Sequence, residues 1–288
     1  MEKTYRLRLY PNKQQQELLA KTFGCQRYVY NYFLDRKITL YKEQGESLSF
    51  AGCSRELTKL KKEKEWLKEP DKYSLQNALK DLDMAYKKFF KEHTGLPKFK
   101  SKKDRHRSYR TNISNNNIAF LGKHIKLPKL GLVKCKGYKE IDGRILNVTV
   151  SQVPSGKYYA SVCVTDIEMP TPPNTGKQVG LGIKDFCITS DGVKYRNPKY
   201  LAQSIKKLQR LQRELSRKTS GGSNWNKSRI KVAKLQEHIA NQRLDCLHKL
   251  SNKLVKENDV ICMENLKVQN MMKNHSSRHI LCKQSVVF

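Results

Sequence analysis

The sequence predicts an α+β protein with more than one domain, and three features of the chain indicate this. Residues 118–167 alternate polar and apolar positions in short runs separated by turns, which is typical of antiparallel strands. Residues 11–95 and 201–254 instead repeat apolar side chains at helical spacing. Residues 169–176 begin with Met-Pro-Thr-Pro-Pro-Asn, a stiff, proline-rich linker between two domains.

The first predicted domain is a small β-barrel with a helical insertion. Residues 4–10 alternate as one strand, and a helix begins directly after them, where Asn12 and Gln15 have the spacing of a capping box. Evenly spaced short strands are typical of a barrel, which the first strand would join. We therefore expect residues 1–10 and 96–168 to form the barrel and residues 11–95 to be inserted as helices.

After the linker, the expected order of elements is a β-hairpin, two helices and a strand. The hairpin begins at residue 179, and a Ser-Gly-Gly-Ser segment at 220–223 separates the helices. Residues 260–264 then form an apolar strand that ends in Glu264. An RNase H-like α/β sheet can use this order, and we assign residues 177–288 to it.

Positive charge dominates the composition. The chain has 58 Lys and Arg against 26 Asp and Glu, a formal net charge of +32 at pH 7. Self-repulsion of that size is relieved by a polyanion, and nucleic acid is the usual one. No apolar run approaches the roughly 18 residues of a membrane span, so no membrane partner is expected. The first residues lack the apolar region of a signal peptide, which favours a cytoplasmic protein.

The eight cysteines do not have metal-binding spacing. No two of them are closer than 16 residues, so the C-x₂-C pairs of a zinc ribbon are absent from the sequence. In a reducing cytosol such residues are most simply buried thiols. We expect no structural zinc.

The carboxylates of an RNase H-like nuclease are incomplete in this sequence. Such a nuclease binds Mg²⁺ through several acids, one of them on the first strand, where this chain has Gly180. Asp185 lies at an odd offset, so in a regular strand it points to the opposite face. Glu264 is the one remaining site-like acid, and no Asp or Glu follows it. We therefore expect no catalytic Mg²⁺ and no nuclease activity.

Two groups of basic and aromatic residues are candidates for gripping phosphates and stacking on bases. A solvated surface loop is the alternative for the basic run at 98–110. The first group has its centre in the basic run at 98–110, and the second surrounds the helix break at 220–223. The first comprises Arg8, Arg27, Lys98, Lys100, Lys102, Lys103, Arg107, Tyr109 and Arg110. The second comprises Arg217, Lys218, Trp225, Lys227 and Arg229.

Eight short motifs occur in the order found in one known family. They are Arg8-Leu9-Tyr10-Pro11, Arg27-Tyr28-Val29-Tyr30-Asn31, Trp66-Leu67, Leu75-Gln76-Asn77-Ala78-Leu79, Phe89-Phe90, Pro97-Lys98-Phe99-Lys100, Ile125-Lys126-Leu127-Pro128-Lys129-Leu130-Gly131 and Leu215-Ser216-Arg217. Through them the chain resembles TnpB, a family of transposon-encoded, RNA-guided DNA nucleases. The resemblance implies a wedge barrel with an inserted recognition lobe, then a RuvC domain.

The chain also departs from the family pattern. The family has Gly-Ile-Asp-Leu-Gly-Ile-Lys-Asp-Phe around residue 180; here either Gly180 replaces the Asp or an Ile-Asp pair is deleted. Glu264 matches the second family acid, but the zinc ribbon and the final Asp are not found, so the RuvC domain is expected to be truncated. The chain thus resembles TldR proteins, the nuclease-dead TnpB derivatives that act as RNA-guided transcriptional repressors.

The resemblance implies a guide RNA, a double-stranded DNA target and one protein per guide RNA, in a bacterial protein that joins the nucleoid when bound to DNA. Base pairing would then carry the sequence specificity, and the protein would read a short flanking motif. A decayed or weakly active nuclease is the main alternative, and an RNA-only binding protein is another. The motif-reading positions of the family match Phe50, Ser54, Lys72, Gln76 and Ser114.

Overall fold

A computed structural model describes residues 2–137, 141, 143–167, 179–180, 187–189, 192–196 and 198–257. The chain divides into two compact units, Met1–Glu168 and Met169–Phe288. Within the described ranges, no helix has the length and the apolar character needed to span a bilayer. The predicted linker at 169–176 and the predicted strand at 260–264 lie outside the described residues.

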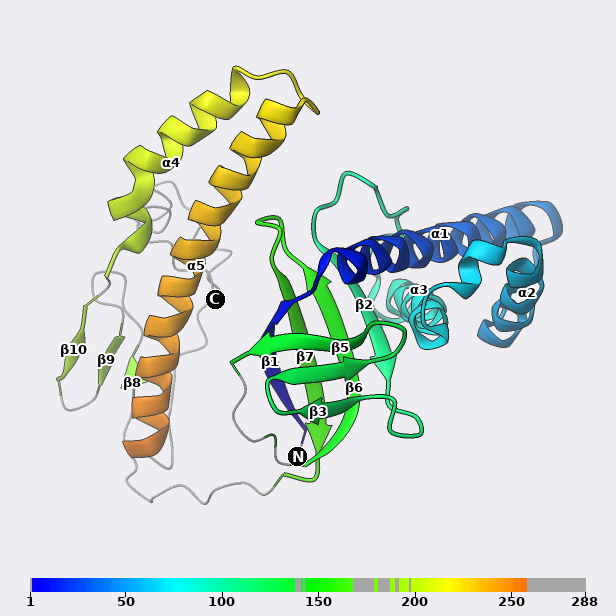
Figure 1. Cartoon of the computed structure of the whole chain (residues 1–288), viewed down its shortest axis with the longest axis horizontal. Coiled ribbons are helices and arrows are strands. Elements are labelled where there is room, and N and C mark those ends of the chain that lie inside the picture. Colours follow the sequence, from blue (N-terminus) through cyan, green and yellow to red (C-terminus); the bar gives the residue numbers. More distant parts are fainter. Residues whose placement is uncertain are drawn as a thin grey trace. The chain divides into compact units, whose positions relative to one another are not determined.

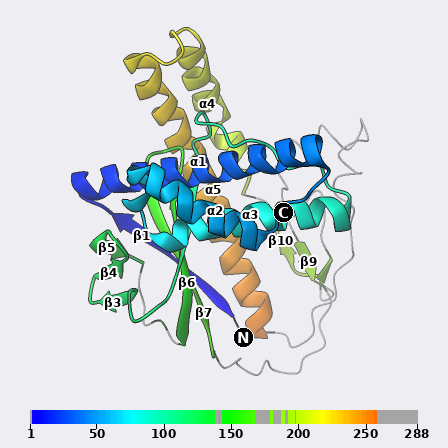
Figure 2. The same ribbon diagram turned by 90° about the vertical axis from the view of Figure 1, so that its right-hand side faces the viewer.

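Seven antiparallel strands form one curled sheet in the first unit, in the order β2-β6-β7-β1-β5-β4-β3 (Figures 1 and 2). The first strand joins this sheet, as predicted, and it lies in the middle, where it pairs with β7 on one side and β5 on the other. The sheet is a half-barrel rather than a closed barrel, because β2 and β3 end the order. The strands are β1 Lys3–Tyr10, β2 Arg107–Asn112, β3 Ala119–Leu121, β4 His124–Leu127, β5 Gly131–Lys136, β6 Arg144–Gln152 and β7 Tyr158–Thr165.

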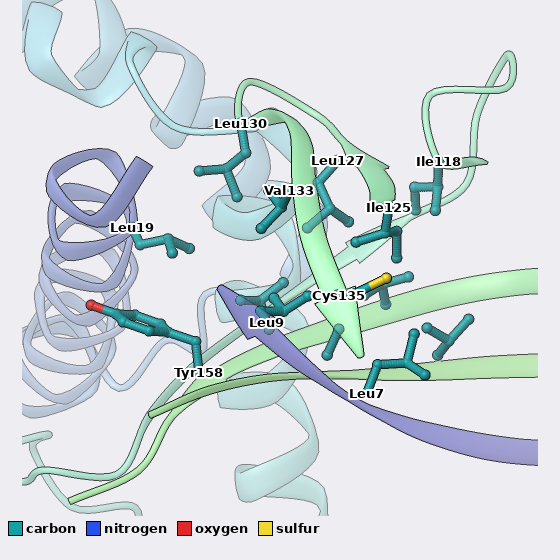
Figure 3. Close-up of a cluster of buried hydrophobic side chains, with 14 of the residues drawn as sticks. Leu7, Leu9, Leu19, Ile118, Ile125, Leu127, Leu130, Val133, Cys135 and Tyr158 are labelled. Carbon is teal, nitrogen blue, oxygen red and sulfur yellow. The ribbon is translucent and has the colours of Figure 1, made fainter. Parts of the chain in front are cut away.

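One face of this sheet is a hydrophobic core. Alternate residues of the strands point inward, so Leu7 and Leu9 of β1 are each only 1% exposed. Helix α1 (Lys13–Gln44) closes the core with Leu19 and Phe23. Figure 3 shows Leu19 pointing from this helix toward the buried side chains of the strands. The inward alternation therefore fixes which residues of each strand face solvent.

Helix α1 is anchored where it leaves the sheet. The Gln15 main-chain N–H donates to Asn12 Oδ1 at 2.8 Å, and the Gln15 side chain accepts from the Asn12 N–H at 3.0 Å, which confirms the capping box. The same Gln15 side chain donates to the carbonyls of Leu130 and Leu132 at 3.1 and 2.8 Å. Gln15 thus ties the start of α1 to the main chain at the start of β5.

The far part of α1 belongs to a second hydrophobic core, made of helices (Figure 1). It packs with α2 (Phe50–Glu63), the short 3-10 helix η1 (Glu65–Lys68) and α3 (Lys72–Glu92). This confirms the expected run of helices between the first strand and the later ones.

The second unit contains a small sheet and a pair of long helices. Strands β8 (Val179–Gly180), β9 (Cys187–Thr189) and β10 (Lys194–Tyr195) are antiparallel in the order β10-β9-β8. Helices α4 (Tyr200–Ser216) and α5 (Ser223–Glu257) follow and pack on each other. The predicted break between them is confirmed.

Candidate nucleic-acid interface

The basic run at 98–110 is fastened to helix α1 by Asn31. The Lys100 main-chain N–H donates to Asn31 Oδ1 at 2.8 Å, and Asn31 Nδ2 donates to the Lys100 carbonyl at 2.9 Å. An asparagine amide can satisfy one main-chain donor and one acceptor at once, so it holds an extended segment as a neighbouring strand would. The charged segment therefore has a fixed course across the helix at this point.

The Lys100 side chain lies among aromatic and acidic groups. Its Nζ sits 4.1 Å from the centroid of the Tyr30 ring, a cation–π contact. Burial lowers the pKa of Lys100, and the nearby carboxylates of Asp81 and Asp104 partly offset this effect. Burial also raises the pKa of Asp81, opposed by Arg110 and Lys100. Lys100, Arg110, Asp81 and Asp104 thus form a small network with two cations and two acids.

A pocket of about 150 Å³ lies between α1 and this segment. Residues from three places line it: α1, the basic run and the start of β2. The lining consists of Phe23, Gln26, Arg27, Lys100, Ser101, Asp104, His106, Arg107 and Ser108. The structure thus brings together Arg27, Lys100 and Arg107, three of the residues predicted to grip phosphates.

Four other predicted residues of the basic run are three exposed lysines and one buried tyrosine. Lys98, Lys102 and Lys103 are exposed, as a role in phosphate contact requires. Tyr109 is only 2% exposed and packs against Phe23 with ring centroids 5.9 Å apart, and burial strongly raises its pKa. The prediction that Tyr109 stacks on a base is wrong in this conformation, because its ring belongs to the core.

The solvent face of the central strands carries a row of stacked cations and rings. The Arg6 guanidinium lies 4.2 Å from the centroid of Tyr159, and that of Arg8 lies 5.1 Å from the same ring. Arg8 also lies 5.4 Å from the ring of Tyr10. Arg8 was predicted here, whereas Arg6 and Tyr159 were missed. The period of two along β1 places Arg6, Arg8 and Tyr10 on one face, and this signal could have identified Arg6.

Four of the five predicted motif-reading residues lie on two helices of the first unit, and the fifth lies after a strand. Phe50 and Ser54 are one turn apart on α2, and the Phe50 ring packs partly on the helical core. Lys72 and Gln76 are both exposed and one turn apart on α3, so they share a helix face. Ser114 follows β2, and its N–H donates to Asn117 Oδ1 at 2.8 Å. Their role in reading a motif stays a prediction.

Buried polar contacts fix α3 against β2, and hence the positions of these residues. Asp71, at the N-cap of α3, accepts a hydrogen bond from Thr111 Oγ1 at 2.7 Å. Asn77 Nδ2 donates to the Arg110 carbonyl at 2.8 Å and to Asn112 Oδ1 at 3.3 Å. Because these groups are buried or half-buried, each bond avoids the cost of an unpaired polar group.

The second predicted group lies around the turn between α4 and α5. Lys218 Nζ donates to Ser228 Oγ, so its ammonium is engaged within the turn. Trp225 was expected in a loop, but it is the third residue of α5 and is partly buried. Arg217 and Lys227 are exposed, and Arg229 is partly buried. Nucleic-acid contact by this group stays a prediction.

Two of the three positions on which the expectation of no Mg²⁺ rests lie outside the described residues. Gly180 is in β8 and pairs with Ile188 of β9, while Asp185 and Glu264 lie outside the described residues. In the part of the chain that is described, no three His, Cys, Asp or Glu side chains come together as metal ligands. The expectations of no zinc and no Mg²⁺ therefore stay predictions.

Comparison with known proteins identifies the family. Residues 161–275 match the OrfB_IS605 family, described as "Probable transposase", and residues 1–46 match HTH_OrfB_IS605, described as "Helix-turn-helix domain". The chain is 34% identical over 279 residues to "Putative RNA-guided DNA endonuclease InsQ" of Escherichia coli (strain K12), covering 94% of this chain and 67% of that protein. The chain belongs to the TnpB family of IS605-type transposases.

A second TnpB-family relative gives the same result. The chain is 32% identical over 286 residues to "Putative RNA-guided DNA endonuclease" of Streptomyces pristinaespiralis, covering 95% of this chain and 69% of that protein. These names correct one prediction. Endonucleases are enzymes, and nothing in the described residues shows an inactive site, so the expectation that this chain is not an enzyme is wrong.

The description "helix-turn-helix" does not fit the structure of residues 1–46 in this TnpB-family chain. They form strand β1 and the single, uninterrupted helix α1. Two solved structures resemble the whole chain: "Cryo-EM structure of the Cas12f1-sgRNA-target DNA complex", with TM-score 0.49, 10% identity and coverage of 99% of this chain and 86% of that chain, and "Cryo-EM structure of CRISPR-Cas12f Ternary Complex", with TM-score 0.41, 12% identity and coverage of 95% and 70%. At these values, neither similarity says what this chain binds.

Proposed function

We propose that this chain binds a guide RNA and uses it to engage double-stranded target DNA beside a short flanking motif, with DNA cleavage as the reaction. The names of the two relatives, which are RNA-guided DNA endonucleases, support this proposal. The observation in this structure that carries it is the basic run fixed on α1, where Arg27, Lys100 and Arg107 line one pocket.

The distribution of charge suits a protein that leaves sequence recognition to base pairing. A heteroduplex is held through its backbone, which requires many cations and few base-reading side chains. The net charge of +32 and the cation–aromatic row of Arg6, Arg8 and Tyr159 both fit such a surface. Transcriptional repression, which the resemblance to TldR implies, stays a prediction.

The experiment tests guided binding and cutting with the complex of the full chain and the RNA that copurifies with it. The RNA that copurifies with the full chain is sequenced, and its guide segment defines a matching duplex. The RNA–protein complex is then mixed with matched and unmatched duplexes in the presence of Mg²⁺. We expect selective binding and cutting of the matched duplex. Equal binding to both duplexes, or binding that does not need the RNA, would contradict the proposal.

A further inference from the structure

We propose that the pocket between α1 and the basic run is a phosphate site, which takes one phosphate group of a nucleic-acid backbone. The choice of a nucleic-acid ligand rests on the proposed function. The pocket itself rests on the structure, since its walls come from helix α1, residues 100–106 and the start of β2.

The first argument is the amide of Gln26. This side chain is only 6% exposed and lines the pocket. Among the described residues its amide makes no hydrogen bond, and its nitrogen and oxygen stay accessible to solvent. The amide is therefore free to bond with a group that enters the pocket. Its NH₂ group can donate to a phosphate oxygen.

The second argument is the charge of the lining. Arg27, Lys100 and Arg107 contribute three cations, and Asp104 is the single acid. Asp104 Oδ1 already accepts the His106 main-chain N–H at 2.9 Å. Arg107 Nε is buried and makes no hydrogen bond to the described residues. Guanidinium groups bind phosphate with several parallel hydrogen bonds, so an unpartnered Arg107 Nε in a pocket that three cations line favours an oxyanion.

The third argument is size. The pocket volume of about 150 Å³ is well above the ~10–15 Å³ that a single water molecule needs. A phosphate group, with one phosphorus and four oxygens, fits this space. Ser101 and Ser108 add hydroxyl donors at the rim. The pocket is therefore large enough to take one backbone phosphate.

The test uses a variant that changes only the amide. Gln26→Glu keeps the shape of the side chain but places a carboxylate where the phosphate oxygens would lie. Gln44→Glu is the matched control, because it makes the same change at an exposed position near the end of the same helix. Arg107→Gln is the second variant in case Gln26→Glu does not fold, which circular dichroism will show.

The first readout is inorganic phosphate, measured by thermal denaturation of the full chain. We expect phosphate to raise the melting temperature of the wild type and of Gln44→Glu more than that of Gln26→Glu or Arg107→Gln. Equal shifts in all four proteins would overturn the phosphate site. This readout does not depend on guided DNA binding, so it decides the pocket even if the proposed function fails.

The second readout identifies the source of the phosphate. Affinity is measured for the copurifying RNA, and separately for matched duplex DNA added to the preassembled complex. We expect at least a tenfold loss for Gln26→Glu in one arm. For Arg107→Gln, the salt slope in that arm should fall by about 0.7 for a single strand or 0.9 for a duplex. A loss in the RNA arm assigns the guide, and a loss only in the DNA arm assigns the target. If both variants bind the RNA and the duplex DNA as tightly as the wild type does, the proposal is overturned.

Discussion

The side-chain amide of Asn31 makes two hydrogen bonds to the main chain of Lys100, 69 positions further along the chain. Asn31 Oδ1 accepts a hydrogen bond from the Lys100 N–H, and Asn31 Nδ2 donates one to the Lys100 carbonyl. This relationship connects a helix that contributes side chains to both hydrophobic cores with a segment whose other residues are mostly exposed. It gives a highly charged segment a defined place, which lowers the entropy that binding has to remove.

Replacing Asn31 by Asp is expected to loosen the basic run without unfolding the protein. The carboxylate can still accept the Lys100 N–H, but it cannot donate to the carbonyl and faces it with negative charge. Hydrogen exchange of residues 101–104 should become faster, and nucleic-acid affinity should fall several-fold. Asn31→Ala should show the same direction. Unchanged exchange in residues 101–104 would mean that Asn31 does not position the run.

Replacing Asp81 by Asn is expected to strengthen nucleic-acid binding. Arg110 Nη2 lies 3.2 Å from Asp81 Oδ1, so the substitution frees a cation, and the salt slope should steepen by about 0.7 to 0.9. Burial raises the pKa of Asp81, so this carboxyl becomes neutral at a higher pH than an ordinary aspartate. The difference between wild type and variant should therefore shrink as pH falls through that pKa.

The control for the Asp81→Asn variant is Asp83→Asn. Asp83 lies on the same helix and pairs with Lys87 at 3.0 Å, one turn along. Affinity measured by fluorescence anisotropy over a range of pH and salt compares the two variants. An equal gain from both would show that net charge, rather than release of Arg110, is responsible.

Replacing Thr111 by Val is expected to lower the free energy of unfolding by about 1–3 kcal/mol, since it leaves the Asp71 carboxylate without its hydroxyl donor. Thr111 is fully buried and Asp71 is only 7% exposed. Denaturant unfolding measures the change. Thr58→Val, at an exposed helical position, should stay within about 0.5 kcal/mol. A similar value for Thr111→Val would show that this contact does not stabilise the packing of α3 on β2.

Replacing Gln76 by Ala is expected to weaken recognition at one position of the flanking motif by about 1–3 kcal/mol, because a glutamine can make two hydrogen bonds to adenine. The exposed position of Gln76 on α3 leaves it accessible to DNA. Binding to a panel of flanking motifs measures this effect. Lys80→Ala, one turn along the helix, should reduce affinity equally across the panel. If Gln76→Ala does the same, the residue does not read a base.

Binding is expected to depend steeply on salt. If the complex neutralises ~8 phosphates of duplex DNA, log K should fall against log salt with a slope of about −7. Titrations at several salt concentrations measure the slope. A slope near zero would show that the net charge of +32 is not directed at a nucleic-acid backbone.

Local patterns predicted the elements well and long-range contacts poorly. The capping residues located the start of α1, and the apolar spacing located both long helices of the second unit. Tyr109 was misassigned because the basic composition of its segment was weighed above the alternation of β2. In that strand Tyr109 and Thr111 face inward, while Arg110 faces outward. The convergence of Gln26 with Arg107, and of Asn31 with Lys100, depends on tertiary packing that no local period encodes.

The central place of β1 has a consequence for synthesis of the chain. Its partners arrive late, since Arg8 pairs with Lys136 and with Tyr159. A ribosome therefore releases the first strand long before either neighbour exists, whereas the helices of residues 13–92 can already pack on one another. Until β5 emerges, β1 presents two unsatisfied edges, and until β7 emerges it still presents one. A chain shortened before residue 158 would keep one of those edges open and be prone to aggregate.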